Sequence, residues 1–186
     1  MFKQRAVFLD RDGTLVKAVY RPDFPKKITC PYFFKELEFM PEAVSTLARL
    51  KKNGLLRIMV TNQPDVALGY MAEREWEAIQ KRVELVLGLD LIKMCRHTTE
   101  QKCPFKKPSP LMLLSAADDL GIDLAGSYMV GDTDADIGAG HAAGCKTILI
   151  ASGEHNMINW KEDCPIPTLE ADFKINRLMD IFDLIK

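Results

Sequence analysis

The stretch Ala6-Val7-Phe8-Leu9-Asp10-Arg11-Asp12-Gly13-Thr14 is the most informative part of this chain. An apolar run is followed at once by two carboxylates and a glycine, which is typical of the carboxyl end of a buried parallel strand, where open α/β sheets bind ligands. Asp10 and Asp12 are therefore candidate catalytic residues that could hold a divalent cation, with one carboxylate oxygen free to attack phosphorus. Taken alone, the same residues also fit an ordinary polar loop that caps a helix.

Beyond this stretch, apolar runs alternate with segments of helical periodicity, which is the pattern of an α/β protein. We predict further strands at 55–60, 89–94, 127–130 and 147–151. Helices are predicted at 41–53, 72–88, 110–120, 135–143 and, closing the chain, 172–185. The expected fold is a Rossmann-like three-layer sandwich around a central parallel sheet of about five strands.

Composition limits the classes of protein that this chain can belong to. Its 186 residues, with 47% hydrophobic content, fit one domain over 1–186. A net charge of -1 provides no basic field for nucleic acid or a membrane surface. With no apolar run long enough to span a bilayer and no signal-peptide pattern, we expect a cytoplasmic protein, and nothing in the pattern suggests more than a monomer. The five scattered cysteines predict free thiols or metal ligands rather than a disulfide framework.

Polar residues also follow the other predicted strands, at the same edge of the sheet. Thr61 and Asn62 offer hydroxyl and amide donors to phosphate oxygens, and Lys107 offers a positive charge. Asp132 would join Asp10 and Asp12 around magnesium, which prefers oxygen ligands. Each cluster has a plainer interpretation as a turn, a solvated loop or a helix cap, but their order at successive strand ends favours phosphoryl transfer to a carboxylate.

These motifs resemble those of the haloacid dehalogenase superfamily of phosphotransferases, and the resemblance covers most of the chain. Asp10-Arg11-Asp12-Gly13-Thr14-Leu15 matches its first motif, Thr61 the second and Lys107 the third. Gly131-Asp132 with Asp136 matches the fourth. The resemblance implies that Asp10 is the nucleophile and Asp12 the general acid/base. It also implies phosphate binding by Thr61 and Lys107, magnesium binding by Asp132, and a supporting role for Asp136.

Within the superfamily, the chain is similar to a small group without a large cap domain, whose substrates include heptose bisphosphates and histidinol phosphate. The implied substrate is a small phosphorylated metabolite, with a heptose-bisphosphate-like sugar phosphate as the first candidate. Leu68 stands where heptose bisphosphatases tend to have an arginine, so histidinol phosphate and other polyol phosphates stay open. A non-catalytic binding protein on the same fold is a further alternative.

Relatives in this group often carry a zinc loop before the third motif, and residues 95–107 are similar to it. Cys95, His97 and Cys103 stand in register with three ligands, whereas Phe105 replaces the fourth. Since structural zinc favours four protein ligands, the segment is either a weaker zinc site or a remnant loop packed around Phe105.

Residues 16–40 do not follow the strand and helix alternation and are predicted to form a flap or loop insertion beside the site. The flap carries four basic residues that could contact a distal phosphate or simply be solvated, namely Lys17, Arg21, Lys26 and Lys27.

Overall fold

The computed structural model describes residues 4–24, 27–151 and 170–185. Its sheets are formed by β1 (Ala6–Leu9), β2 (Val19–Tyr20), β3 (Ile28–Thr29), β4 (Leu56–Asn62), β5 (Leu91–Cys95), β6 (Tyr128–Gly131), β7 (Lys146–Ile150) and β8 (Phe173–Ile175). The α-helices are α1 (Ala43–Lys52), α2 (Glu73–Leu87), α3 (Leu111–Leu120) and α4 (Asp134–Ala143), and the 3-10 helices are η1 (Phe34–Glu36) and η4 (Leu178–Asp183). The order β5-β4-β1-β6-β7-β8 forms one sheet with parallel pairing throughout, which confirms the predicted fold class.

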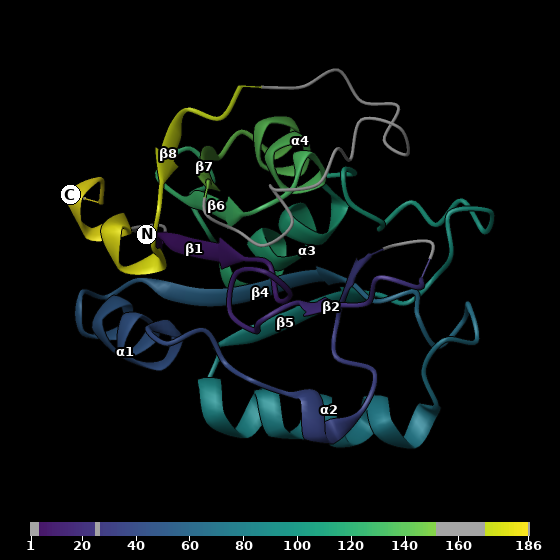
Figure 1. Cartoon of the computed structure of the whole chain (residues 1–186). Helices are drawn as coiled ribbons and strands as arrows, with labels where there is room; N and C mark the ends of the chain where they lie inside the picture. The colour runs from purple at the N-terminus through teal and green to yellow at the C-terminus, as the bar shows by residue number, and fades with distance from the viewer. Residues whose placement is uncertain (1–3, 25–26, 152–169, 186) are drawn as a thin grey trace.

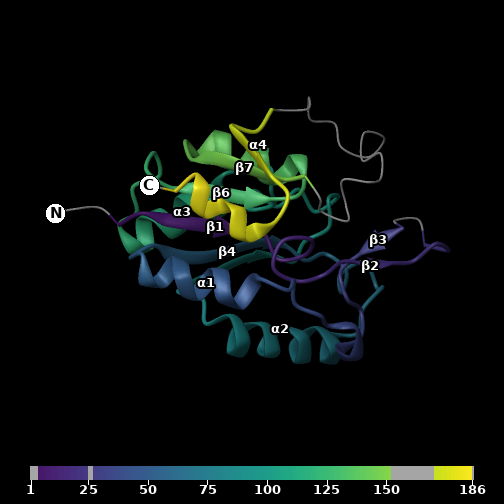
Figure 2. The ribbon, with the colours of Figure 1, turned by 60° about the vertical axis from the view of Figure 1, so that its left-hand side comes forward.

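Helices cover both faces of the central sheet, so the molecule has three layers (Figures 1 and 2). On one face, α1, α2 and η4 bury side chains such as Leu47, Ile79 and Ile181 against the sheet. On the other face, α3 and α4 contribute Met112 and Ala139 to a separate apolar cluster. Because both faces are covered, β1 and β6 are buried at every position, which is why these strands appear in the sequence as continuous apolar runs.

The end of the chain differs from the prediction. A helix was expected over 172–185, but the structure has the strand β8 followed by the short 3-10 helix η4. Phe173 and Ile175 alternate with Lys174 as a sixth strand beside β7, whereas Leu178 and Ile181 have a spacing that resembles helical periodicity. Pairing with the edge strand β7 outweighed the helical spacing of this segment. Just before β8, Asp172 accepts hydrogen bonds from the backbone N–H and the hydroxyl of Thr147 in β7.

The described part of 16–40 holds only short regular elements, and its action as a flap beside the site stays a prediction. The strands β2 and β3 pair as a small antiparallel hairpin, which Figure 2 shows beyond the end of the main sheet. Between this hairpin and α1, the short helix η1 lies against α2. Within the described residues there is no large cap domain, and no described helix is long and apolar enough to cross a membrane.

Candidate active site

The register of the three central strands brings the first motif to the second and the fourth. Leu9 is paired with Met59 of β4 on one side and with Val130 of β6 on the other. The next residue, Asp10, donates its backbone N–H to the carbonyl of Val130 at 3.0 Å. Asp10, Thr61 and Asp132 therefore meet at the carboxyl edge of the sheet, as the sequence predicted.

Lys107 lies at the centre of this arrangement and is buried. Its ammonium group donates to Asp10 Oδ1 at 2.7 Å, Asp136 Oδ1 at 2.5 Å and the Val60 carbonyl at 2.8 Å. Burial by itself would lower the pKa of Lys107, but Asp10 and Asp136 outweigh it and raise that pKa above its ordinary value. Lys107 therefore stays protonated and holds one oxygen of the Asp10 carboxylate in place.

A buried acidic group faces Lys107 from the turn between β6 and α4. One carboxylate oxygen from each of Asp10, Asp132 and Asp136 lies within 4.8 Å of the others. Asp136 Oδ2 accepts hydrogen bonds from the hydroxyl and the backbone N–H of Thr133, which caps α4. Burial raises the pKa of Asp136, although Lys107 and Thr133 act in the opposite direction. Clustered oxygen ligands of this kind suit a hard divalent cation such as magnesium.

Thr61 and Asn62 end β4 beside this group, but they have different contacts. Thr61 is buried, with its hydroxyl oxygen accepting from Gln63 Nε2 at 2.9 Å. The Asn62 amide exchanges two hydrogen bonds of 3.0 Å with the backbone N–H and carbonyl of Lys107. Asn62 thus holds the Lys107 backbone in this structure, and its expected contact with phosphate remains a prediction.

Two residues that the sequence analysis did not assign to the site hold Asp12. Arg11 is fully buried, and its Nε contacts Asp12 Oδ1 at 3.2 Å and Oδ2 at 3.1 Å. Burial by itself would lower the pKa of Arg11, but the adjacent carboxylates, Asp12 above all, raise it. Gln63 donates from Nε2 to Asp12 Oδ2 at 2.6 Å. Both residues lie in or next to the motifs, but nothing in the sequence alone indicated that their side chains turn inward.

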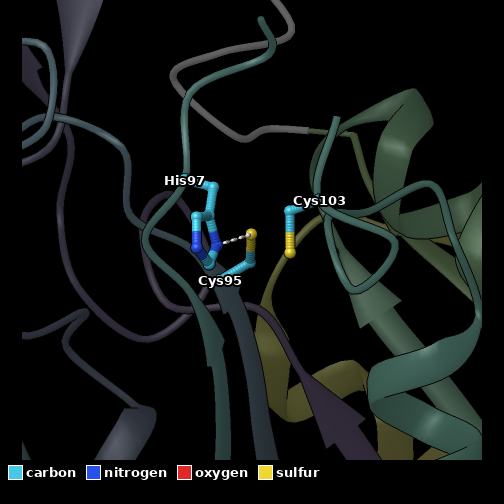
Figure 3. A group of neighbouring side chains, drawn as sticks. All are labelled: Cys95, His97 and Cys103. Carbon is cyan, nitrogen blue, oxygen red and sulfur yellow. Dashed lines mark hydrogen bonds between the residues drawn. The ribbon is translucent and has the colours of Figure 1, made fainter. Parts of the chain in front are cut away.

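The predicted zinc-loop ligands converge in space. Cys95, His97 and Cys103 point toward one another in Figure 3, with ligand atoms within 4.8 Å of each other. Cys95 Sγ lies 3.7 Å from His97 Nδ1. Phe105, in place of the fourth ligand, is 42% exposed.

Two of the four basic flap residues are engaged within the flap itself. Lys17 pairs with Glu38 at 2.7 Å, and Arg21 pairs with Glu36 at 2.5 Å. Arg21 also lies over the Tyr32 ring at 4.4 Å from its centroid. Lys27 is exposed, and Lys26 lies outside the described residues.

Comparison with known proteins defines the class to which this fold and site belong. Residues 104–177 match a family model described as HAD-hydrolase-like. Curated proteins that are 33% to 34% identical match almost the whole chain. The chain belongs to the haloacid dehalogenase superfamily, and it is a phosphoric monoester hydrolase.

The similar proteins have closely related names. D-glycero-beta-D-manno-heptose-1,7-bisphosphate 7-phosphatase of Pasteurella multocida is 33% identical over 197 residues, which cover 98% of this chain and 97% of that protein. The protein of the same name in Escherichia coli K12 is 34% identical over 195 residues, or 97% of this chain and 93% of its own. Among solved structures, D,D-heptose 1,7-bisphosphate phosphatase from B. bronchiseptica, complexed with magnesium and phosphate, has a TM-score of 0.78 at 26% identity and covers 97% of both chains.

Proposed function

We propose that this enzyme hydrolyses a heptose-bisphosphate-like sugar phosphate through an aspartyl-phosphate on Asp10. The observation that carries the mechanism is the Asp10 carboxylate, which Lys107 holds by one oxygen at the carboxyl edge of the sheet. The substrate class is supported by the names of relatives that match nearly the full length of the chain.

The proposed roles follow from the chemistry of each side chain. The other oxygen of Asp10 attacks phosphorus, and Asp12 gives a proton to the departing sugar oxygen. Asp12 then takes a proton from the water that hydrolyses the aspartyl-phosphate. Thr61 donates its hydroxyl hydrogen to a phosphate oxygen, and Lys107 offsets the negative charge of the phosphoryl group. Asn62, as a substrate-binding residue, would contact a phosphate oxygen through its amide in addition to holding the Lys107 backbone.

The cluster of Asp10, Asp132 and Asp136 has a ligand chemistry that fits magnesium. Asp10 and Asp132, with the backbone carbonyl of Asp12, would supply oxygen ligands, whereas Asp136 is engaged with Lys107 and Thr133. When bound, the cation would neutralise charge on the transferring phosphoryl group. We expect chelation of magnesium to abolish turnover and its addition to restore it.

Histidinol phosphate or another polyol phosphate is the alternative substrate. Leu68 is 40% exposed and apolar, so it brings no charged donor for a second phosphate at this position. Lys17 and Arg21 are likewise engaged by flap carboxylates. Either substrate would use the same mechanism, so the relative rates of phosphate release distinguish them.

The decisive experiment is phosphate release with magnesium from a panel of heptose, polyol and amino-alcohol phosphates. Asp10→Asn should lower turnover at least about 1000-fold, because the nucleophile is lost. Asp118→Asn, which changes an exposed carboxylate on α3, should leave turnover unchanged. Preference for a polyol phosphate would replace the heptose assignment. The absence of turnover across the panel would favour a non-catalytic binding protein.

We also propose that Cys95, His97 and Cys103 bind zinc with three protein ligands. Their convergence supports this proposal, and the lack of a fourth ligand at Phe105 implies a zinc ion that chelators remove readily. Purified protein should contain up to one equivalent of zinc, which Cys103→Ser removes and Cys145→Ser, a buried cysteine elsewhere, retains. Zinc-free protein with unaltered stability would instead identify a remnant loop.

We further propose that residues 1–186 work as one phosphatase domain, as a monomer in the cytoplasm. The shared sheet and its two apolar clusters support the single domain. Light scattering of the purified protein tests the monomer, and cell fractionation tests the location.

A further inference from the structure

Gln63 is a buried polar residue at the edge of the proposed site, and its backbone is firmly placed. It follows β4 directly and is 2% exposed. Its backbone N–H donates to the Cys95 carbonyl at 2.7 Å, which continues the pairing of β4 with β5 by one residue. The side chain therefore starts from a fixed point beside Asp12 and Thr61.

The contacts of Gln63 determine which way its amide faces. The Oε1 atom accepts a hydrogen bond from Arg11 Nη2. Since a guanidinium group can only donate, the amide oxygen must face Arg11 and the amide nitrogen must face away from it. That nitrogen donates to Asp12 Oδ2 at 2.6 Å and to Thr61 Oγ1 at 2.9 Å. Gln63 thus joins the buried guanidinium, the proposed acid/base and the proposed phosphate ligand.

This arrangement makes the two oxygens of Asp12 different. Oδ2 accepts from both Gln63 and Arg11, whereas Oδ1 accepts, among the side chains that the structure describes, from the shared Arg11 Nε at 3.2 Å. An oxygen that already accepts two hydrogen bonds from charged or amide donors is the poorer place for a proton. Oδ1 is therefore the oxygen of Asp12 that is better placed to pass a proton to a leaving group. In the same way, Thr61 Oγ1 accepts from Gln63, so its own hydrogen is left to donate to a phosphate oxygen.

We propose that Gln63 is a positioning residue for proton transfer by Asp12, an inference that rests on the proposed function. As the Asp10–phosphorus bond forms, the phosphorus–oxygen bond to the sugar breaks and its electron pair goes to the sugar oxygen. That oxygen takes the proton from Asp12 Oδ1, which leaves Asp12 as a carboxylate. Gln63 holds the carboxyl group so that Oδ1 is the oxygen that faces the leaving group.

The test compares two substrates whose need for this proton differs. A sugar phosphate has a poor leaving group and requires general acid catalysis, whereas a dinitrophenyl phosphate leaves without a proton. Gln63→Met keeps the length of the side chain but removes both donors and the acceptor. We expect it to lower kcat/KM about 10- to 100-fold for the sugar phosphate and less than about threefold for the activated ester. Since kcat/KM covers steps only up to departure of the leaving group, hydrolysis of the aspartyl-phosphate does not enter the comparison.

Two further variants keep the test decisive. Gln80→Met removes another buried glutamine amide, on α2, and should leave both kcat/KM values unchanged. Gln63→Glu keeps the acceptor for Arg11 and the side-chain volume, and should show the same selective loss if Gln63→Met does not fold. Equal losses on both substrates, or no loss on either, would overturn the positioning role. Wild-type protein that hydrolyses neither substrate would instead overturn the proposed function.

Discussion

Lys107 is held from two sides, through its ammonium group and through its backbone. The ammonium group has an acceptor for each of its three hydrogens, and the backbone is paired with the Asn62 amide. Fixing a long flexible side chain in one position costs conformational entropy, which these hydrogen bonds offset. The position of the charge beside Asp10 therefore depends on a neighbour that need not touch the substrate.

We predict that Asn62→Ala weakens the enzyme without removing any charged group. The loss of two hydrogen bonds should lower the free energy of unfolding by about 1 to 2 kcal/mol. Looser placement of Lys107 should reduce kcat/KM about 10-fold. Urea unfolding and steady-state kinetics check both values, with Asn53→Ala at the exposed end of α1 as the control. Unchanged kinetics in Asn62→Ala would show that Lys107 does not need this support.

The turn from β6 into α4 leaves no room for a side chain at Gly131. A Cβ atom there would lie 2.3 Å from Cγ of Asp136, which is itself fixed by Thr133 and Lys107. Gly144, which ends α4 with φ of 79°, has open space around it and needs glycine only for its backbone conformation.

The two glycines should therefore respond differently to alanine. Gly131→Ala displaces Asp136 and should lower both activity, by at least about 100-fold, and the free energy of unfolding, by about 2 to 4 kcal/mol. Gly144→Ala should cost about 1 kcal/mol and leave activity intact. Chemical unfolding together with phosphate release distinguishes the two, and an active Gly131→Ala enzyme would contradict the steric conflict with Asp136.

The pairing of β4 with the start of β5 includes a carboxylate that makes stability depend on pH. Asp90 accepts from the Arg57 backbone at 2.8 Å and from its guanidinium at 2.8 and 2.9 Å. Burial alone would raise the pKa of Asp90, but these hydrogen bonds outweigh it and lower that pKa. A lowered pKa in the folded state means that the stabilisation is present above the unfolded pKa and lost as the pH falls through the folded one.

We accordingly predict that Asp90→Asn is less stable than wild type by about 1 kcal/mol at pH 7, a value reduced by partial exposure of Asp90 to solvent. The difference should shrink as the pH falls below about 4, where the wild-type carboxylate also takes up a proton. Urea unfolding at several pH values measures this difference, with Asp118→Asn as an exposed control. A gap that is independent of pH would rule out the carboxylate as its source.

Residues at the end of the chain complete the core that its earlier elements form. β8 extends the sheet beside β7, and η4 packs against α1, with the Arg49 guanidinium 3.9 Å from the centroid of the Phe182 ring. Ile181 of η4 is fully buried in the same cluster as Leu47 of α1. Residues 170–185 thus belong to the structural core rather than to a loose tail.

Truncation of this core contact should be costly. We expect Ile181→Ala to lower the free energy of unfolding by about 2 to 5 kcal/mol, because it leaves a cavity between η4 and the sheet. Leu85→Ala on α2, where the side chain is 74% exposed, should change it by less than about 0.5 kcal/mol. Thermal and urea unfolding provide the comparison, and similar effects from both variants would refute the structural role of η4.

Local patterns in the sequence predicted the elements that are long or strongly marked. The apolar run before Asp10 and the helical spacing in 72–88 correspond to a strand and a helix whose observed ends lie within a residue or two of the predicted ones. Residues 172–185 were predicted wrongly, because a short edge strand followed by a 3-10 turn can carry the same apolar spacing as a helix. Only the partner strand β7 distinguishes the two.

The sequence by itself determined the fold class, the superfamily motifs and which residue types stand at the strand ends, since periodicity and spacing are local properties. Tertiary structure alone decided that Arg11 and Gln63 turn inward to hold Asp12, that Asn62 supports Lys107, and that Cys95, His97 and Cys103 converge. Contacts of this kind join residues distant along the chain or depend on which way a side chain points. They exist only once parallel strands have brought their ends to one edge of the sheet.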